Sequence, residues 1–416
     1  MERQVALLLA LCAMFLWGSW ANTLLLFRTR FELYLFNYIL GHFLAGFLML
    51  QDALPCLHAV TGTTGMIVIL VSGLAGALFA LGSLLAVASL DLVGMALPTL
   101  VLLSIEMALG MPLLLLLEGW DTPAQLMYSI LGILAVLVAA TLDAWCHSSL
   151  QEDRASRERE EVGQCLDLSG QFSSLSFWSF RATSAAASMM PGSLARSLSP
   201  EATTRLTFLT HGSVLPSSIS GSQQVLTVHS GTVLSGRRFK HAQLGLVLAA
   251  GGGFCFAGWP CVASIVEGQS RWVIFSVQLN ASAFFFIYAF GAVIAVILLL
   301  PPLCRRPLHT GVPLNFWRSY SELTIWQHFL GLCGGFAHGL GCLLSVQSGH
   351  VLGNAMAMSI TRCQPLVCAI WGVLVWGELQ GARCKTILIL LAMLLMFVLA
   401  LICFFLSFLF AGQNQA

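Results

Sequence analysis

Apolar stretches long enough to cross a membrane recur along the chain in two groups, separated by a polar segment. A helix that spans the hydrocarbon core needs about 20 predominantly apolar residues, because each residue advances the helix by about 1.5 Å. The pattern therefore predicts an all-α membrane protein with ten transmembrane helices. The predicted spans are roughly 4–27, 31–50, 66–89, 92–117 and 124–146, then 242–264, 275–300, 326–348, 352–376 and 386–410.

The polar segment covers residues 148–240. It opens with the charged run "QEDRASREREE" and continues with Ser- and Thr-rich text such as "VLPSSISGSQQ". Because few regular apolar periods occur in it, we expect this segment to be mostly disordered. The chain thus divides into an N-terminal five-helix repeat over 1–147, this loop, and a C-terminal five-helix repeat over 241–416.

The two five-helix units repeat each other in sequence. "LGSLLAVASLDLVGMA" at 81–96 aligns without gaps on "LGCLLSVQSGHVLGNA" at 340–355, with eight of the sixteen positions identical. Matching Gly, Ser and Ala residues at the joint between two spans are harder to obtain from composition alone than matching leucines. Because each unit has an odd number of spans, the copies must lie in the membrane in opposite orientations. This predicts two inverted five-helix repeats, as in secondary transporters that bind substrate near the midplane.

Composition agrees with a membrane carrier. The 416 residues are 58% hydrophobic and 9% charged, which is too much apolar surface for a soluble core. The net charge of +1 comes without a basic stripe, so we expect no nucleic-acid partner. The thirteen cysteines form no CxxC pair and no His-rich cluster, so we expect apolar packing and no metal site. The expected partners are the lipid bilayer and a small-molecule substrate, and nothing in the sequence points to a particular oligomeric state.

Basic residues gather on one side of the predicted spans, and the opposite side contains Arg3 and Arg271. The positive-inside rule places the richer side, and with it the polar loop, in the cytosol. We expect the plasma membrane, with an endomembrane as the alternative. The basic residues of the richer side are Arg28, Arg30, Arg305, Arg306, Arg318, Arg383 and Lys385, with Arg154, Arg157, Arg159, Arg237, Arg238 and Lys240 flanking the loop.

The first span of each unit contains a weak point followed by a tryptophan. "FLWGSW" in span 1 corresponds to "FCFAGW" in span 6. Gly18, Gly258 and the following Pro260 weaken the helix, so each span can bend there as a gate. Irregular backbone at membrane depth lines a cavity or packs inside protein, which makes Trp20 and Trp259 candidate walls of a substrate site. Tight helix packing at the two glycines is the alternative.

Two charged residues lie near the middle of equivalent spans, Glu106 in span 4 and Arg362 in span 9. A charge at the bilayer centre costs about 2.5–3.5 kcal/mol on insertion scales, so each charge calls for a reason. Equivalent spans approach each other across the axis that relates the repeats, and we expect an ion pair. Glu106 is a candidate carrier of the coupling proton, and Arg362 is a candidate donor to substrate carbonyl oxygens. A permanent structural pair is the alternative.

Further polar side chains inside the spans are candidates for the transport pathway. His42 in span 2 is a candidate proton carrier, and His338 in span 8 is a candidate for binding the edge of a ring. Gln347 is a candidate for amide recognition of a heterocycle. Hydrogen bonding within the helix bundle is the alternative for all of them.

From about residue 326 onward the sequence resembles a known transporter family. "GLCGGFAHGLG" followed by "QPLVCAIWGVLVWGELQ" is similar to the closing half of the ureide permeases, in the drug/metabolite transporter superfamily. The segment "LGSLLAVASLDLVG" and the Gly-x-Trp element of span 1 look similar too. The chain departs from the family at His338, where members tend to have Asn.

The resemblance implies a secondary active transporter of small polar nitrogen heterocycles, such as allantoin, uracil or other nucleobases, that works by alternating access. It also implies proton symport, so that a proton gradient supplies the energy and no cofactor is expected. The segment "GTVLSGRR" lacks the Lys and Ser or Thr of a phosphate-binding loop, so we expect no nucleotide hydrolysis.

Three alternatives stay open from the sequence. The first is a carrier of the same superfamily for another solute, such as a sugar, a nucleotide-sugar or an amino acid. The second is an intramembrane enzyme, which the absence of HExxH, GxSxG and paired-Asp motifs disfavours, so we expect no enzymatic activity. The third is a scaffold or receptor that uses the Ser-rich loop for docking.

Overall fold

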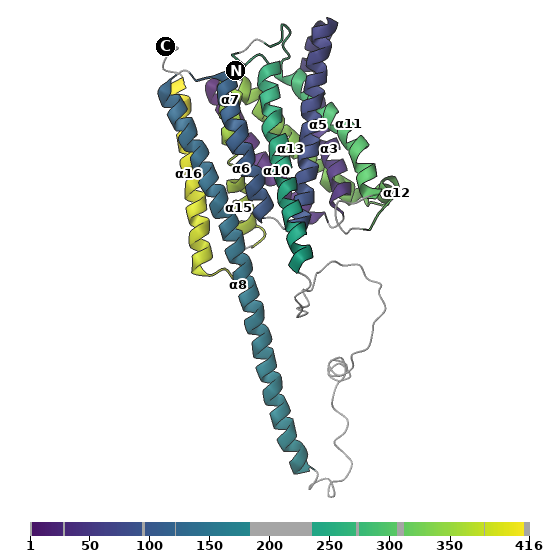
Figure 1. The fold of residues 1–416 in the computed structure, drawn as a ribbon, viewed down its shortest axis with the longest axis vertical. Helices are drawn as coiled ribbons and strands as arrows, with labels where there is room; N and C mark the ends of the chain where they lie inside the picture. The colour runs from purple at the N-terminus through teal and green to yellow at the C-terminus, as the bar shows by residue number, and fades with distance from the viewer. Residues whose placement is uncertain are drawn as a thin grey trace. The chain divides into compact units, whose positions relative to one another are not determined.

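The structure is a computed structural model, and it describes residues 2–27, 30–93, 96–120, 122–183, 235–271, 274–305, 312–377 and 379–411. All regular elements in these ranges are helices (Figure 1). In chain order they are α1 (Arg3–Ser19), α2 (Ala21–Leu26), α3 (Phe31–Phe47), α4 (Leu50–Ala59), α5 (Gly62–Val93), α6 (Ala96–Ile105), the π-helix η1 (Glu106–Gly110), α7 (Met111–Glu118), α8 (Pro123–Thr183), α10 (Ser235–Val266), α11 (Ala281–Arg305), α12 (Phe316–Ser321), α13 (Ile325–Leu352), α14 (Asn354–Thr361), α15 (Gln364–Leu374) and α16 (Cys384–Ala411).

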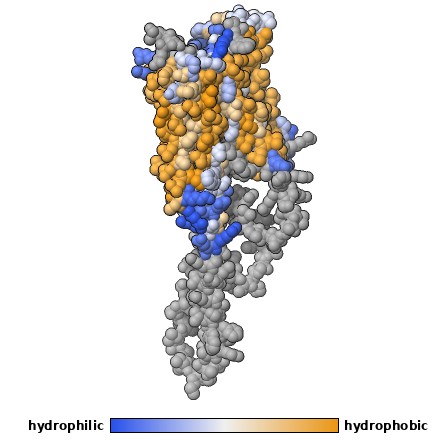
Figure 2. Space-filling view, turned by 60° about the vertical axis from the view of Figure 1, so that its left-hand side comes forward, coloured by the Kyte–Doolittle hydropathy of each residue, from blue (hydrophilic) through white to orange (hydrophobic). Residues whose placement is uncertain are grey.

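Nine helical stretches among the described residues are long and apolar enough to cross a bilayer. The pair α3 and α4, which is bent by 76°, makes a tenth if it counts as one span. Figure 2 shows apolar side chains covering the helices on the face it presents, with hydrophilic residues gathered toward their ends. The chain is therefore an integral multi-pass membrane protein, and the number of spans agrees with the hydropathy pattern.

The chain forms two compact units, Met1–Arg154 with Ser235–Ala416, and Ala155–Leu234. In the second unit α8 continues as a helix to Thr183. Over 148–183 the structure thus differs from the mostly disordered loop that we expected for 148–240. The charged run is rich in Glu and Arg, which are good helix formers, so a helix that has already begun can extend through it. Residues 184–234 lie outside the described part of the chain.

Glycines let α13 pack closely against α3. A Cβ atom at Gly335 would lie 1.7 Å from the carbonyl oxygen of Tyr38, and one at Gly339 would lie 2.8 Å from Cα of His42. No side chain fits at those distances, so these positions require glycine. The close approach of the two backbones brings His42 of α3 next to the face of α13 that carries His338.

Within the compact unit formed by Met1–Arg154 and Ser235–Ala416, the helix contacts of the N-terminal half correspond to those of the C-terminal half. α1 packs against α13, and its counterpart α10 packs against α5; α3 packs against α13, and its counterpart α11 packs against α5. α8 and α16 lie side by side (Figure 1) and are joined by hydroxyl pairs, Ser129 with Ser407 at 2.9 Å and Ser149 with Thr386 at 2.6 Å. Because the residue order is reversed between these two pairs, α8 and α16 run antiparallel.

The predicted weak points have different structures in the two halves. α1 ends at Ser19, just after Gly18, where a Cβ atom would lie 2.4 Å from Cβ of Val367. Gly18 is therefore a position of close helix packing. The break predicted at Gly258 and Pro260 is absent, because α10 runs through both residues as one helix. A proline removes a single helical hydrogen bond, which a helix supported by neighbours tolerates. The gating role of these residues stays a prediction.

Glu118 fixes the joint between α13 and α14. After Gly353, whose φ is +87°, the first two amides of α14 donate to the carboxylate of Glu118, from Asn354 at 3.0 Å and from Ala355 at 2.9 Å. A carboxylate at a helix N-terminus satisfies amides that have no partner within the helix. Glu118 thus connects the end of α7 in the first half to the start of α14 in the second.

Replacing Gly335 by Ala should destabilise the protein by about 1–3 kcal/mol, because the added methyl group pushes α13 away from α3. The measurement is the thermal unfolding midpoint of the purified protein in detergent. Gly73→Ala is the matched control, since a Cβ atom at Gly73 meets nothing within 4 Å. Equal midpoints for the two variants would contradict the proposed role of the close contact.

Glu118→Gln should lower stability by about 1–3 kcal/mol, because the amide removes the charge and replaces one of the two accepting oxygens by a donor. Glu322→Gln is the control, because Glu322 pairs with Arg318 on the surface, with side chains 63% and 81% exposed. Thermal unfolding of both variants tests this. A loss of stability of the same size in Glu322→Gln would contradict this role of Glu118 at the start of α14.

Candidate functional site

A cavity of about 200 Å³ lies between helices of the two halves. Helices α1, α3, α5 and η1 of the first half and α10 and α13 of the second contribute to its walls. The lining combines aromatic, aliphatic and polar side chains. The aromatic and polar residues of the lining are Trp17, Trp20, Tyr34, Tyr38, Phe79, Ser83, Ser89, Glu106, Phe256, Trp259, His338, Cys342, Arg362 and Gln364.

Glu106 and Arg362 form an ion pair in this cavity, between Oε1 of the carboxylate and Nη2 of the guanidinium. Both side chains are buried, with 5% and 8% of their surface exposed. The expected approach of these two residues is thus found in the structure. Both lie where a helix is irregular: Glu106 opens the π-helix η1, and Arg362 lies in the break between α14 and α15. Pro365 follows closely and cannot donate a helical hydrogen bond, which favours the break.

Trp17 connects this ion pair to His338. The guanidinium carbon of Arg362 lies 4.8 Å from the centre of the indole ring. The indole stacks on the imidazole of His338 at 5.3 Å between centroids with 6° between the planes, and its Nε1 donates to the carbonyl oxygen of His338 at 3.3 Å. Trp17 therefore holds the cation and the imidazole at fixed places on the same side of the cavity.

Trp20 and two tyrosines form a further aromatic wall. The Trp20 ring lies 5.0 Å from Tyr38, and it meets His338 edge-on at 5.9 Å. Tyr34 stacks on Tyr38 at 5.9 Å, and its hydroxyl is paired with Thr23 Oγ1 at 2.8 Å. Trp20 is less buried than Trp17, so its ring offers contact area to a bound molecule. Rings of this kind suit a planar ligand.

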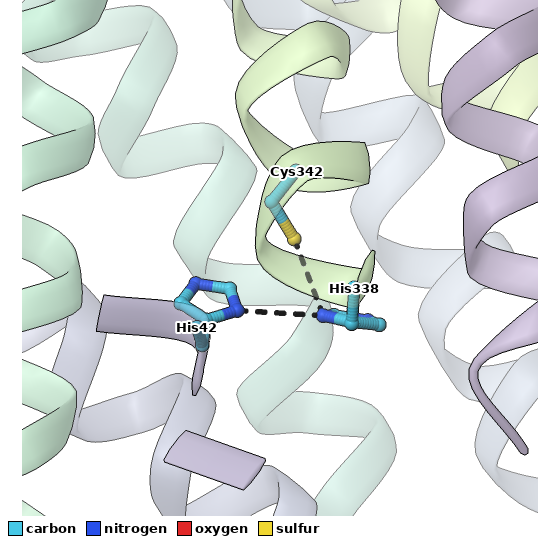
Figure 3. Close-up of side chains that lie close together, drawn as sticks. All are labelled: His42, His338 and Cys342. Atoms are coloured by element: carbon cyan, nitrogen blue, oxygen red, sulfur yellow. Dashed lines mark hydrogen bonds between the residues drawn. The ribbon is translucent and has the colours of Figure 1, made fainter. Parts of the chain in front are cut away.

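His42 and Cys342 both lie next to His338 (Figure 3). Nδ1 of His338 lies 3.5 Å from Nδ1 of His42 and 3.6 Å from Sγ of Cys342. His42 is fully buried, stacks on Phe79 at 4.9 Å, and does not line the cavity. Its Nε2 atom has no hydrogen-bond partner among the described residues.

The other candidates from the sequence divide into two groups. Trp259 lines the cavity as expected and is buried against Tyr288, with 5.2 Å between the rings. Gln347 is not among the residues that line this cavity, and its Nε2 donates to Sδ of Met49 at 3.4 Å. Its role in substrate binding stays a prediction. Gln347 follows His338 by nine positions on α13, which is about two and a half helical turns. The two side chains therefore project from opposite sides of the helix.

Sequence reasoning missed Trp17, Tyr38 and Cys342. A signal existed for two of them, because Trp17 precedes Trp20 by three residues and Cys342 follows His338 by four, spacings that place side chains on one face of a helix. Tyr38 carries no such signal, since it reaches the cavity only through the packing of α3 on α13.

The charge of the lining limits what the cavity can bind. Arg362 is the one Lys or Arg among the described residues of the lining, and Glu106 already balances its charge. The site therefore offers aromatic surface, a guanidinium fork and a carboxylate without a net charge. Such a site fits a small, planar, polar and uncharged molecule.

Comparison with known proteins finds one matching family model and several related plant proteins. The sequence model described as "Ureide permease" matches residues 237–407. Ureide permease 1 of Arabidopsis thaliana is 29% identical over 164 residues, which cover 39% of this chain and 41% of the relative. Ureide permease 2 of the same plant is 29% identical over 171 residues, covering 39% and 40%, and Ureide permease 4 is 30% identical over 141 residues, covering 33% and 32%.

The matched part thus spans about two fifths of the length of Ureide permease 1 and Ureide permease 2. No solved structure matches the chain significantly. The family match includes α13, the break at Arg362 and α15, so the second half of the cavity lies within it. These findings confirm the resemblance seen in the sequence: residues 237–407 match the sequence model of the ureide permease family.

Proposed function

We propose that the chain is a secondary active transporter of small polar nitrogen heterocycles, that it couples their movement to protons, and that it works by alternating access. The observation that carries this proposal is the cavity between the two halves, with the Glu106–Arg362 pair in its wall. The match to ureide permeases supports the substrate class, which includes allantoin, uracil and other nucleobases.

The size and chemistry of the cavity support a small heterocycle over the larger alternatives. Its volume of about 200 Å³ is below the roughly 300–1,000 Å³ of sites for drug-sized ligands. A ring can stack on Trp20 while its carbonyl oxygens accept hydrogen bonds from the fork of Arg362. A nucleotide-sugar carries a diphosphate, which is usually bound by several basic side chains, and Arg362 is the one basic residue among the described residues of the lining.

The ion pair suggests how protonation and substrate binding can each favour the other. While Glu106 is ionised, Arg362 is held in the ion pair with it and is less available to a ligand. A proton on Glu106 removes that charge and releases the guanidinium for substrate carbonyl oxygens. By linkage, bound substrate then favours protonation to the same extent, which is the thermodynamic basis of symport. His42 has no role in this scheme, because it does not line the cavity.

The helix contacts support the arrangement as two inverted repeats. Exchanging the two halves converts the α1–α13 pair into the α10–α5 pair, and the α3–α13 pair into the α11–α5 pair. In this arrangement the halves rock about the cavity and open it to each side in turn. We place the polar loop in the cytosol and the protein in the plasma membrane, with an endomembrane as the alternative.

The direct test is uptake of labelled allantoin, uracil and hypoxanthine by permease-deficient cells that express the chain. We expect at least one of them to accumulate above the level of cells with an empty vector, more strongly at lower external pH, and an uncoupler to abolish the accumulation. Uptake of a sugar, a nucleotide-sugar or an amino acid without uptake of any heterocycle would favour the alternative carrier.

Substitutions of the ion pair separate a proton carrier from a structural pair. Glu106→Gln should remove the dependence of uptake on pH, because an amide cannot take up the coupling proton. Arg362→Gln should reduce uptake strongly, because it removes the guanidinium fork and leaves a buried carboxylate without its partner. The double variant Glu106→Gln with Arg362→Gln leaves no unpaired charge and should fold better than either single variant, yet stay inactive. Recovery of pH-dependent uptake in the double variant would mean that the pair is structural.

Trp20→Ala should raise the KM for a heterocycle about tenfold or more, because stacking of a base on an aromatic ring is worth about 1–3 kcal/mol. Trp326→Ala is the control, since Trp326 is 61% exposed on α13 and does not line the cavity. Concentration-dependent uptake by both variants, normalised to surface expression, checks this, and an unchanged KM in Trp20→Ala would remove Trp20 from the site.

A further inference from the structure

Three side chains of types that bind metal ions lie close together within the helix bundle: His42, His338 and Cys342 (Figure 3). One ligand atom from each lies within 4.8 Å of the others. Their positions in the chain are far apart for a metal motif, which is why the sequence predicted no metal site. We propose that these three residues form a binding site for a thiophilic d10 metal cation, Cu⁺ or Zn²⁺.

The two donor distances that involve His338 fit ligands of one metal ion. Metal–nitrogen bonds of about 2.0–2.1 Å and metal–sulfur bonds of about 2.3 Å place neighbouring donors roughly 3.3–3.8 Å apart, for trigonal or tetrahedral angles. Nδ1 of His338 lies 3.5 Å from Nδ1 of His42 and 3.6 Å from Sγ of Cys342. The ligand atoms of His42 and Cys342 lie within 4.8 Å of each other, so at most a rotation of these side chains brings all three donors to the ion.

Rigid packing holds the three donors in place. Cys342 follows His338 by one helical turn on α13, so the two share a face. The backbone of His42 is held by its close contact with Gly339. Its imidazole lies against the rings of Phe79 at 4.9 Å and Phe285 at 5.3 Å. His42 and Cys342 are fully buried, and binding sites of high precision are built on such rigid elements.

The donor set and its charge select the class of metal. One thiolate and two neutral imidazoles are soft to borderline ligands, which favour Cu⁺ and Zn²⁺ over Mg²⁺ or Ca²⁺. With Cu⁺ the complex has no net charge, and with Zn²⁺ it has a single positive charge. A neutral complex costs less in a region of low dielectric constant, so the charge balance favours Cu⁺.

The coordination sphere has a free position toward the transport cavity. His338 and Cys342 both line that cavity, whereas His42 approaches from behind them. Three protein ligands with one open position are typical of metal sites that bind an exogenous ligand. A ring nitrogen or a carbonyl oxygen of a molecule in the cavity is the kind of group that can complete the sphere.

Metal content of the purified full chain tests the site independently of transport. The protein in detergent is stripped with a chelator, incubated with Cu⁺ under anaerobic reducing conditions or with Zn²⁺, desalted, and analysed by mass spectrometry for metal. We expect the wild-type chain to retain a stoichiometric amount of at least one of the two. Cys342→Ser and His338→Asn should each weaken binding by at least about tenfold.

Cys333→Ser is the matched control, because Cys333 lies on the same helix outside the cluster. It should bind as the wild-type chain does. Thermal unfolding of each metal-free variant shows whether it is folded. Binding of Co²⁺ gives a second readout, because a cobalt–thiolate bond produces a charge-transfer absorption band, which Cys342→Ser should abolish. Retention of no metal by the wild-type chain, or equal retention by folded Cys342→Ser, would overturn the proposal, whatever the result of the uptake experiments.

Discussion

The ion pair between Glu106 and Arg362 constrains the centre of this protein more than any other contact. Neither charge is tolerable alone at that depth, since breaking a buried pair costs about 3–5 kcal/mol. Glu106 belongs to the N-terminal half and Arg362 to the C-terminal half, so the pair fixes how closely η1 approaches the segment between α14 and α15. Both residues lie where the regular α-helix is interrupted: Glu106 in the π-helix η1 and Arg362 in the break before α15. Both side chains line the cavity.

Contacts extend from the ion pair along the cavity wall to the metal-binding cluster. Arg362 lies over Trp17, Trp17 stacks on His338, and His338 contacts His42 and Cys342. A change of protonation at Glu106, a ligand on Arg362 and a metal ion at His338 would therefore act on one continuous set of side chains. Close packing at the glycines of α13 keeps this set rigid in the conformation described here.

Much of the architecture was predictable from the sequence, because a bilayer imposes a minimum length on apolar helices. The internal repeat placed Glu106 and Arg362 on equivalent spans, and their ion pair followed from that placement. The extension of α8 to Thr183 was not predicted, because a run of low hydropathy and high charge is compatible both with disorder and with a solvent-exposed helix. The interrupted helix at Arg362 was not predicted either, although Pro365 follows it and cannot donate a helical hydrogen bond.

Other parts of the site depend on contacts between distant segments and had no local signal. The cluster of His42, His338 and Cys342 arises because glycines bring α3 onto α13. Gln347 was expected in the site because its chemistry suits a heterocycle, but its place on the helical turn directs it away. Residue type thus indicated candidates, and helix geometry together with backbone packing decided which of them meet.

A cryo-electron-microscopy structure of the chain with a transported heterocycle bound would test the account most directly. We predict density for one ring in the cavity between the halves, stacked on Trp20 and within hydrogen-bonding distance of Arg362, with the Glu106–Arg362 pair opened. Density for the heterocycle outside this cavity, or a bound state in which the ion pair stays intact and makes no contact with the ligand, would contradict it.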